Sequence, residues 1–294
     1  MSPLSRWLSR HMAKLALAPS LIVICIAVYG FIAFTTVLSF TGSRMLPNFN
    51  FVGWLQYERL WNSPRWIVAV TNFGLFAVLY IGITTALGLG LAILLDQKVR
   101  AEGVLRSIYL YPMSISFIVT GVAWQWLMAP DLGLEKAFHA WGWTSFRFDW
   151  IKDEQMAIYC IVIAGIWQAA GFVMALFLAA LRGINGEIIL AAKIDGAGGP
   201  QIYRHVVVPA LRPAFLTALV VQGHLAIKSY DLVVALTRGG PGYATELPST
   251  FMYGYTFTRN EMAVGAASAV TMLITLAAVI VPYLYSELKN QDAR

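Results

Sequence analysis

The sequence has little charge, few cysteines and no set of residues with the spacing of metal ligands. Only 12% of its 294 residues are charged, and its two cysteines, Cys25 and Cys160, lie in apolar runs, where a thiol is more often a small buried hydrophobe than half of a disulfide. The four histidines are scattered, and neither HExxH nor CxxC occurs, so no metal motif is present. GxxxxGK[ST] is also missing, so no nucleotide-binding module is expected.

The abundant residues are apolar. Hydrophobic residues make up 59% of the chain and the mean hydropathy is +0.66, more than the interior of a soluble domain of this size can hold. Apolar runs of about 20 residues cross membranes as helices, which satisfy their own backbone hydrogen bonds. Six runs are predicted to do so, at residues 15–40, 67–95, 107–128, 156–181, 214–236 and 264–285. The expected fold class is an all-α polytopic membrane protein with a single domain over residues 1–294.

The positions of Lys and Arg predict the orientation. With the N-terminus inside, the cytoplasmic segments hold twelve basic and six acidic residues, whereas the outer segments hold eight of each. Because basic residues collect on the cytoplasmic side, the net charge of +6 indicates orientation rather than nucleic-acid binding. The first run is too long for a signal peptide and is expected to remain as an anchor. We therefore expect a multi-pass membrane protein with both termini in the cytoplasm.

Two predicted outer loops, residues 41–66 and 129–155, are rich in aromatic residues. Their tryptophans are Trp54, Trp61, Trp66, Trp141, Trp143 and Trp150. Such rings are enriched where a membrane meets water, so membrane lipid is an expected partner of these loops.

A charged, glycine-punctuated segment from Glu187 to Pro209 interrupts the apolar runs. Residues 187–194 are predicted to continue as a helix from the fourth span, Asp195-Gly196 to break it, and Gly198-Gly199 to permit a reversal. Pro200 suits the first position of a second short helix that ends near Pro209. From the residues alone, the segment is either an amphipathic anchor in the membrane interface or a docking element for a soluble partner.

The segment also resembles a known motif. The run Ala191-Ala192-Lys193-Ile194-Asp195-Gly196-Ala197, followed by Gln201, Tyr203 and residues 206–209, resembles the EAA loop of binding-protein-dependent ABC importer permeases. This implies that residues 183–212 form a cytoplasmic coupling loop that docks into a separate ATP-hydrolysing subunit. The residues implied in coupling are Glu187, Ala191, Ala192, Asp195, Gly196, Gln201, Tyr203 and Pro209. Where the family has Glu before the Ala-Ala pair, this chain has Leu190, and Glu187 one helical turn earlier is the candidate substitute.

Matches to the carbohydrate-uptake branch of these permeases extend from about residue 15 to 285. They are Phe51-Val52-Gly53-Trp54 with Tyr57 and Leu60, Arg106 and Pro112, Trp167 with Gly171 and Phe172, and Lys228, Asp231, Thr237 and Gly239 to Pro241. The resemblance implies the six-helix fold of a type I importer permease in the bacterial cytoplasmic (inner) membrane. It also implies a sugar substrate, with a glucose- or mannose-like monosaccharide favoured.

The same resemblance implies the partners. A dimer of ATP-binding cassettes would bind ATP and Mg²⁺, so this chain would carry no cofactor and would not itself be an enzyme. A second, similar permease chain would complete a heterodimer, and an extracytoplasmic sugar-binding protein would deliver the substrate. No nucleic-acid partner is expected.

Three ionisable residues fall inside the fifth predicted span. His224, Lys228 and Asp231 are spaced i, i+4 and i+7, and charged groups in a span usually face the bundle interior or a water-filled cavity. Lys228 and Asp231, three apart, can pair and so lower the penalty for both. The pair either fixes the packing of this span or contacts the sugar.

Neutral polar residues complete the predicted substrate pathway. Gln222 and Ser229 lie on another stripe of the fifth span, and Gln168 lies beside Trp167 in the fourth. Amides and hydroxyls match the hydroxyls of an uncharged sugar without burying a charge. Hydrogen bonding between helices is the alternative role of each. Further candidates in the third span are Ser114, Ser116 and Gln125.

The segment Gly239-Gly240-Pro241-Gly242 is predicted to form a turn in an outer loop, because glycine pairs before proline favour tight reversals. The turn serves either its own geometry or contact with an extracytoplasmic binding protein.

The leading hypothesis is an ATP-driven sugar importer in which ATP moves the Glu187–Pro209 segment as a rigid lever and switches access across the membrane. One alternative is an ion-coupled secondary transporter with Lys228, Asp231 or His224 as a proton relay. Such transporters usually show internal repeats, and the sequence shows none. Another is an intramembrane enzyme, but the spans contain no carboxylate pair, zinc motif or nucleophile elbow.

Overall fold

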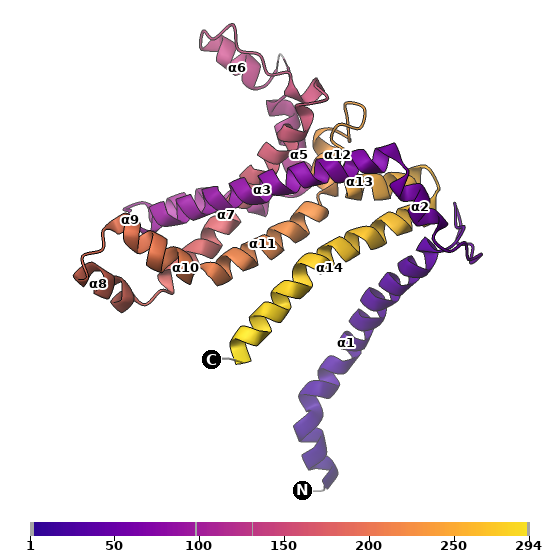
Figure 1. Ribbon diagram of the computed structural model, residues 1–294, viewed down its shortest axis with the longest axis horizontal. Helices are drawn as coiled ribbons and strands as arrows, with labels where there is room; N and C mark the ends of the chain where they lie inside the picture. The colour runs from indigo at the N-terminus through magenta and orange to yellow at the C-terminus, as the bar shows by residue number, and fades with distance from the viewer. Residues whose placement is uncertain (1–2, 98, 131, 293–294) are drawn as a thin grey trace. The chain divides into compact units, whose positions relative to one another are not determined.

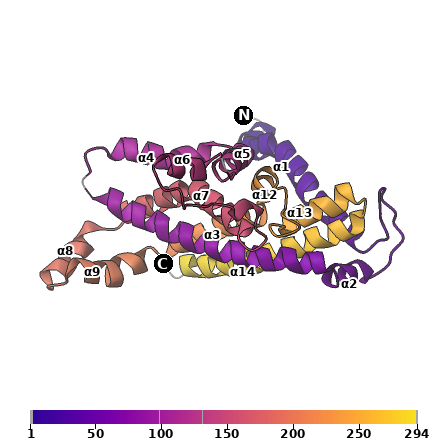
Figure 2. The same cartoon turned by 90° about the horizontal axis from the view of Figure 1, so that it is seen from above.

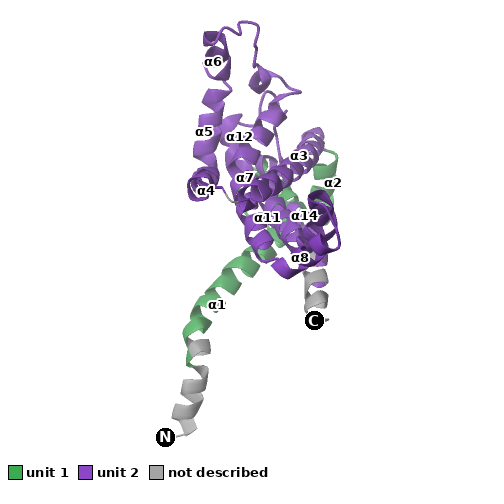
Figure 3. Ribbon diagram, turned by 90° about the vertical axis from the view of Figure 1, so that its left-hand side faces the viewer, with its two compact units in different colours: residues 1–62, 252–271 green, residues 63–251, 272–294 purple. Residues whose placement is uncertain are grey.

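The computed structural model describes residues 3–97, 99–130 and 132–292, and this part of the chain is built from helices with one isolated antiparallel bridge between Thr41 and Phe51. The chain divides into two compact units, residues 1–62 with 252–271 and residues 63–251 with 272–294 (Figure 3). The single domain over residues 1–294 stays a prediction, and the two units are described separately. The first unit separates because its long helix buries only 6% of its apolar window.

In the first unit, α1 (Pro3–Ser39) runs into a short loop that folds back on its end before α2 (Leu55–Trp61). The Val52 N–H donates to the Phe40 carbonyl over 2.8 Å. The rings of Trp54 and Tyr57 lie 5.1 and 5.4 Å from the Phe40 ring. The motif that includes Val52, Trp54 and Tyr57 therefore caps the end of α1. The unit also contains η4 (Gly254–Thr258) and the first part of α14 (Met262–Asp292).

The second unit contains most of the remaining elements. Its helices are α3 (Pro64–Asp96), α4 (Glu102–Leu110), α5 (Phe117–Leu127), α6 (Leu134–Ala140), α7 (Ala157–Arg182), α8 (Gly186–Ile194), α9 (Gly199–Ile202), α10 (Val208–Ala210), α11 (Arg212–Ile227), α12 (Tyr230–Leu236) and the first part of α13 (Pro248–Tyr253). Its shorter elements are the 3₁₀ turns η1 (Tyr111–Ser114) and η2 (Trp150–Lys152) and the π turn η3 (Tyr203–Val207).

Helices α3 and α7 form the centre of the second unit and lie side by side (Figures 1 and 2). Phe76 and Ile161 share one buried cluster near the start of both helices. Ala92 and Phe177 share a second cluster near their ends. The two helices therefore run in the same direction, and the second cluster lies where α7 leads into the Glu187–Pro209 segment.

By length and hydropathy, four described helical stretches can cross a membrane. These are Ala16–Ser39, Pro64–Asp96, Ala157–Arg182 and Met262–Pro282. Two more stretches qualify only as bent pairs, which gives up to six crossings in the described part of the chain. The first, second, fourth and sixth predicted spans thus coincide with continuous helices, and the third and fifth do not.

The third predicted span is broken rather than straight. The stretch Glu102–Ser114 meets Phe117–Leu127 at an angle of 101°. Pro112 lies in the 3₁₀ turn before the break, and the Ser116 hydroxyl then accepts the Val119 N–H over 3.3 Å, which caps a new helix. One serine within an apolar run does not signal a break on its own, so hydropathy predicts a single helix over this stretch.

The fifth predicted span is also interrupted. Helix α11 ends at Ile227 and α12 begins at Tyr230, with the Tyr230 N–H donating to the Lys228 carbonyl over 2.7 Å. At the other end of α11, Gly199–Ala210 meets Arg212–Ile227 at 60°. The fifth span is therefore a short helix, a break and a further short helix.

Candidate functional site

The segment from Glu187 to Pro209 forms two short helices that follow α7, and α8 projects beyond the ends of α3 and α7 (Figures 1 and 2). We call residues 186–210 the coupling element. The sequence predicts that the first helix continues from the fourth span, but the structure shows two separate helices. Residues 183–185 separate the two, and the Asn185 side chain accepts the Glu187 N–H over 2.9 Å. This N-cap starts a new helix whose direction differs from that of α7.

The turn after α8 is a glycine-dependent helix end. The Gly196 N–H donates to the Lys193 carbonyl over 3.1 Å, and the Ala197 N–H donates to the Ala192 carbonyl over 3.0 Å. These two bonds make a Schellman motif, which requires a left-handed residue after the cap. Gly196 supplies it with φ +82°. The Ala192–Ala197 part of the predicted motif is thus explained by backbone geometry.

Helix α9 is capped by a side chain from its own first turn. The Gln201 Oε1 accepts the Gly198 N–H over 3.0 Å. Pro200 fills the first turn, where no intrahelical N–H bond is needed. Gln201, a predicted coupling residue, therefore holds the reversal in shape.

Pro209 lies inside a continuous helical stretch. A proline in this position lacks an N–H and crowds the carbonyl four residues earlier. The π turn η3 widens the helix before it, because the Val208 N–H donates to the Tyr203 carbonyl, five residues back. Tyr203, itself half-buried, packs against the cluster at the end of α3 and α7. The helix then ends at Ala210, close to the predicted limit.

The second half of the coupling element is anchored in the protein. Ile202, Val207 and Leu211 are buried in the cluster that also contains Ala92 and Phe177. Movement of α9 and η3 must therefore be transmitted to α3 and α7, because packed interiors deform little.

The first half of the coupling element presents its side chains outward. Ile188, Leu190 and Ile194 are 54%, 59% and 86% exposed. The predicted residues Glu187, Ala191, Asp195, Gly196, Gln201 and Pro209 are exposed too, whereas Ala192 is half-buried. Exposed apolar side chains gathered on one projecting element are typical of an interaction surface.

An ionic cluster lies where α7 leads into the coupling element. The Arg182 Nη2 is 2.7 Å from Glu102 Oε1 at the start of α4, and its Nε is 3.9 Å from Asp96 Oδ1 at the end of α3. All three side chains are partly exposed, so the pairs add little stability. Their effect is to hold three helix ends together beside the element.

The predicted pathway residue Gln168 ties α7 to the break between α4 and α5. It is buried, and its Nε2 donates to the Ile115 carbonyl over 2.7 Å. That carbonyl lies where the helix is interrupted and lacks a helical partner, so the amide replaces the lost bond. Trp167 is 40% exposed, with its ring 5.9 Å from the Trp124 ring.

Gln222 and Ser229 are both buried. The Gln222 Nε2 donates to Thr85 Oγ1 on α3 over 3.1 Å, and the Ser229 hydroxyl donates to the Leu225 carbonyl over 2.9 Å. In the described part of the chain, the side-chain oxygens of Gln168 and Gln222 are buried without a hydrogen-bond partner. The side-chain amides of Gln168 and Gln222 thus form hydrogen bonds between helices, which was the alternative to sugar contact. Each amide still has a carbonyl oxygen that accepts no hydrogen bond.

We expect Gln222→Ala to slow the sugar transport that the sequence resemblance implies more than Thr85→Val does. Both changes remove the same hydrogen bond between α3 and α11, worth about 0.6 kcal/mol in a membrane, but only the first removes the unpartnered carbonyl oxygen. Initial uptake rates at equal amounts of assembled complex provide the measurement. Equal rates for the two variants would leave the hydrogen bond as the function of Gln222.

The ionisable residues of the fifth predicted span do not share one helix. Lys228 lies in the break between α11 and α12, and the side chains of His224, Lys228 and Asp231 are all exposed. Among the described residues, no ion pair joins Lys228 and Asp231. The pairing that the sequence allows is therefore not formed in this structure, because the broken helix changes the helical spacing of the two residues.

The glycine-rich turn after α12 is held to α3 by residues that the sequence did not single out. Arg65 pairs with the buried Glu246, with 2.6 Å between Nη2 and Oε1, and its guanidinium lies 4.3 Å from the centre of the Tyr243 ring. The Asn72 amide donates to the carbonyls of Ala244 and Glu246 over 3.0 and 3.1 Å. Nothing in the sequence links positions so far apart, and only the fold brings them together.

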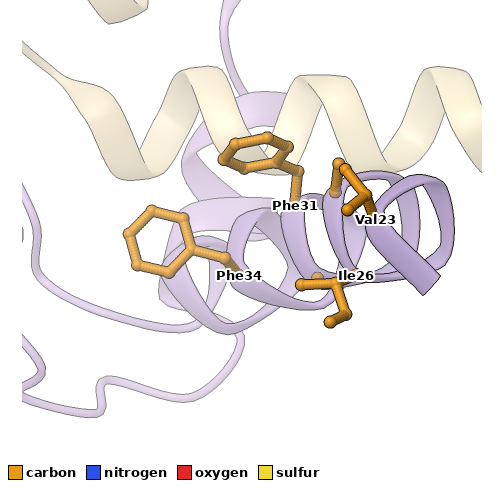
Figure 4. A pocket seen from close by; sticks show the side chains of 6 residues that line it. Val23, Ile26, Phe31 and Phe34 are labelled. Atoms are coloured by element: carbon orange, nitrogen blue, oxygen red, sulfur yellow. The ribbon is translucent and has the colours of Figure 1, made fainter. Parts of the chain in front are cut away.

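A hollow of about 540 Å³ runs along α1 within the first unit (Figure 4). It is lined by Val23, Ile26, Ala27, Gly30, Phe31 and Phe34. These residues offer no polar side chain, so the hollow suits lipid tails or another apolar helix and not a polar solute.

Comparison with known proteins identifies the chain's relatives. Residues 82–290, which include the coupling element, match the family described as binding-protein-dependent transport system inner membrane component. The chain belongs to this family. It is therefore the inner-membrane component of an ABC importer, and the ATPase of such a transporter is a separate chain.

Relatives match this permease over nearly its whole length. A probable ABC transporter permease protein of Pyrococcus horikoshii is 40% identical over 280 residues, which cover 95% of this chain and 96% of the relative. A xylose/arabinose import permease protein of Haloferax volcanii is 34% identical, covering 92% of this chain and 86% of the relative. The structure of a bacterial ABC transporter involved in the import of alginate shares the fold, with a TM-score of 0.83 and 18% identity over 98% of this chain and 99% of that one.

These matches confirm three predictions from the sequence: the permease family, the all-α membrane fold and the location of ATP hydrolysis on another chain. The roles of individual residues stay predictions, and we take them up below.

Proposed function

We propose that this permease is one membrane subunit of an ATP-driven sugar importer and that its coupling element docks into the ATPase. The observation that carries the proposal is the division of the element into two halves. Exposed apolar residues on α8 face outward, while Ile202, Val207 and Leu211 are buried beside α3 and α7. A segment that binds the ATPase through α8 and is packed in the protein core through its second half can transmit movement from the ATPase to α3 and α7.

The expected mechanism follows from this arrangement. ATP binding favours one arrangement of the ATPase dimer, and the docked coupling element passes that preference to the helices packed against it. The long α7 carries the change towards the opposite end of the second unit. The family membership supports this mechanism over an ion-coupled carrier.

A sugar is the proposed substrate, supported by the Haloferax volcanii relative named for xylose and arabinose import. The finer assignment to a glucose- or mannose-like monosaccharide rests on resemblance alone. Buried neutral groups such as Gln168 and Gln222 suit an uncharged solute, because they bind hydroxyls without a desolvated charge.

We also propose the surroundings of the chain. Both termini would lie in the cytoplasm, as the charge distribution predicts. A second permease chain would complete the membrane part, and the apolar hollow along α1 would contact that chain or lipid. The ATPase dimer, with its ATP and Mg²⁺, would bind at the coupling element, and an extracytoplasmic sugar-binding protein at the opposite end.

Uptake into vesicles tests the proposed function. The permease is reconstituted with its neighbouring permease, ATPase and binding protein, and radiolabelled xylose, arabinose, glucose, mannose and maltose are offered in turn. We expect uptake of at least one sugar that stops when the ATPase cannot bind nucleotide and persists when the proton gradient is collapsed. Uptake that collapses with the gradient and ignores the ATPase would instead establish an ion-coupled carrier.

Charge reversal at Glu187 tests the docking surface. We expect Glu187→Lys to reduce co-purification of the ATPase several-fold, because Glu187 is exposed on α8 one turn before Leu190, where the resembled family carries its Glu. Glu58→Lys is the matched control, since it makes the same change at an exposed position on α2. An undiminished yield of the complex with Glu187→Lys would show that the apolar face alone holds the ATPase.

A further inference from the structure

A hollow of about 420 Å³, open to the surface and called the cavity below, lies in the second unit at the end opposite the coupling element. Its walls come from the end of α5, the turn η2 and the turn after α12. The turn η2 precedes the 26-residue α7 and α8 follows it, so a helix about 39 Å long connects the cavity to the coupling element. The main lining residues are Gln125, Ile151, Lys152, Leu236, Gly240 and Pro241.

Two polar side chains in this cavity are free to bind a ligand. Within the part of the chain that the structure describes, the half-buried Gln125 amide and the exposed Lys152 ammonium form no hydrogen bond or ion pair. An amide both donates and accepts, and an ammonium donates three hydrogen bonds. Ile151, Leu236 and Pro241 provide apolar surface beside them. The cavity thus combines hydrogen-bonding groups with an apolar wall.

Hydrogen bonds and helix packing within the protein fix the shape of the cavity before any ligand binds. The hydroxyls of Thr237 and Thr245 lie 2.7 Å apart, and the Thr245 hydroxyl also donates to the Gly240 carbonyl over 3.0 Å. Helices α5 and α12 meet so closely at Gly121 that a Cβ there would lie 2.5 Å from the Ala235 Cβ. Binding sites for small molecules are commonly formed in advance in this way.

We propose that this cavity is a binding subsite for a neutral sugar. Its volume falls in the range of small-molecule sites, which is about 300–1,000 Å³. The C–H face of a pyranose would pack on Ile151, Leu236 and Pro241, and its hydroxyls would bind Gln125 and Lys152. Among the described lining residues, Lys152 is the one that carries a charge. The inference rests on the proposed sugar transport and adds a site at the far end of α7.

Protection of an introduced thiol tests this subsite in the assembled importer. Cys25, the exposed native cysteine, is first changed to Ser, while Cys160 is buried. Gln125→Cys is then labelled with a maleimide in the absence of binding protein, with and without 10 mM (roughly the scale of a weak, millimolar site) of the sugar that the wild-type importer transports. Leu132→Cys, 72% exposed and outside the cavity, is the control.

We expect the transported sugar to slow labelling at residue 125 several-fold and to leave residue 132 unchanged. Unchanged labelling at both positions would overturn the subsite. Protection given only by sugar-free binding protein would overturn it too, because the cavity would then be a protein-docking surface. If Gln125→Cys does not assemble, Lys152→Cys takes its place. A wild-type importer that takes up no sugar would refute the proposed function itself, which keeps the two failures apart.

Kinetics provide a second measurement. Gln125→Ala is expected to raise the KM for uptake about tenfold at unchanged maximal rate, which corresponds to about 1.4 kcal/mol, in the range of one hydrogen bond. Gln155→Ala, an exposed glutamine outside the cavity, is the matched control. A KM equal to that of the control would count against the subsite.

Discussion

Replacing Gly171 with alanine is expected to prevent assembly of the permease. The added Cβ would lie 1.8 Å from the Tyr109 carbonyl oxygen and 3.2 Å from the Leu110 Cα. Both are backbone atoms of α4 and cannot rotate away as a side chain would, so α4 and α7 must separate. Overpacking of this kind costs about 3 kcal/mol, a large part of the stability of a typical domain. The yield of monodisperse protein on size-exclusion chromatography should fall several-fold.

Gly90→Ala provides the matched control. Gly90 is an exposed residue within α3, and a Cβ there would meet nothing within 4 Å. Alanine is also the better helix former by about 1 kcal/mol, so this variant should be at least as stable as the wild type. A wild-type yield and melting temperature for Gly171→Ala would show that α4 does not pack against α7 in the assembled protein.

Replacing Gly196 with valine is expected to abolish sugar uptake while the permease still inserts. Gly196 has φ +82°, a conformation that is strained for a β-branched residue. The Schellman bonds of Lys193 and Ala192 carbonyls would be lost or distorted, and α8 would leave its position relative to α9. ATP hydrolysis should then continue without transport, because it takes place on the separate ATPase. The permease should still insert, because Ile202 and Val207 keep the second half of the element packed in the core.

The measurement compares uptake with ATP hydrolysis in the same vesicles. Gly186→Ala is the control, because Gly186 begins α8 and a Cβ there would meet nothing within 4 Å. It should leave both activities intact. If Gly196→Val transports sugar at the wild-type rate, the turn is not part of the path that transmits movement.

The coupling element is the part of this fold that the sequence predicts best. Asp195-Gly196 and Pro200 predict the turn between its two helices, and Pro209 predicts where it ends. The backbone preferences of these residues act locally, so they can be read without knowledge of the fold. The missed detail is also local. Gly183 to Asn185 end α7 and start a new helix, although the apolar residues around them suggest continuity.

The two broken spans could not be predicted from hydropathy. An apolar run reports that a segment avoids water, and it says nothing about whether a distant side chain satisfies the backbone at a break. Here the Gln168 amide on α7 donates a hydrogen bond to the carbonyl of Ile115, which lies 53 positions earlier in the chain. The interruption at Lys228 and Ser229 likewise invalidates an argument from regular helical spacing.

The remaining site residues depend on tertiary structure. Arg65 and Glu246 are 181 positions apart in the chain, and neither lies in a recognisable motif. The cavity beside Gly240 combines residues from three separate segments. Sequence reasoning could name Gln125 as polar within an apolar run, but only the fold places it beside Lys152.

The bends of the coupling element are fixed by short-range bonds, from the Asn185 cap to the Gln201 cap. Such a hairpin of helices would keep its form whether or not the proposed ATPase partner is bound. Little chain entropy is then lost each time the two subunits meet, so a modest contact area can give firm yet reversible attachment. An unstructured linker of equal length would lose conformational entropy on binding. Part of each movement of the ATPase would then extend the linker and would not reach the helices of the permease.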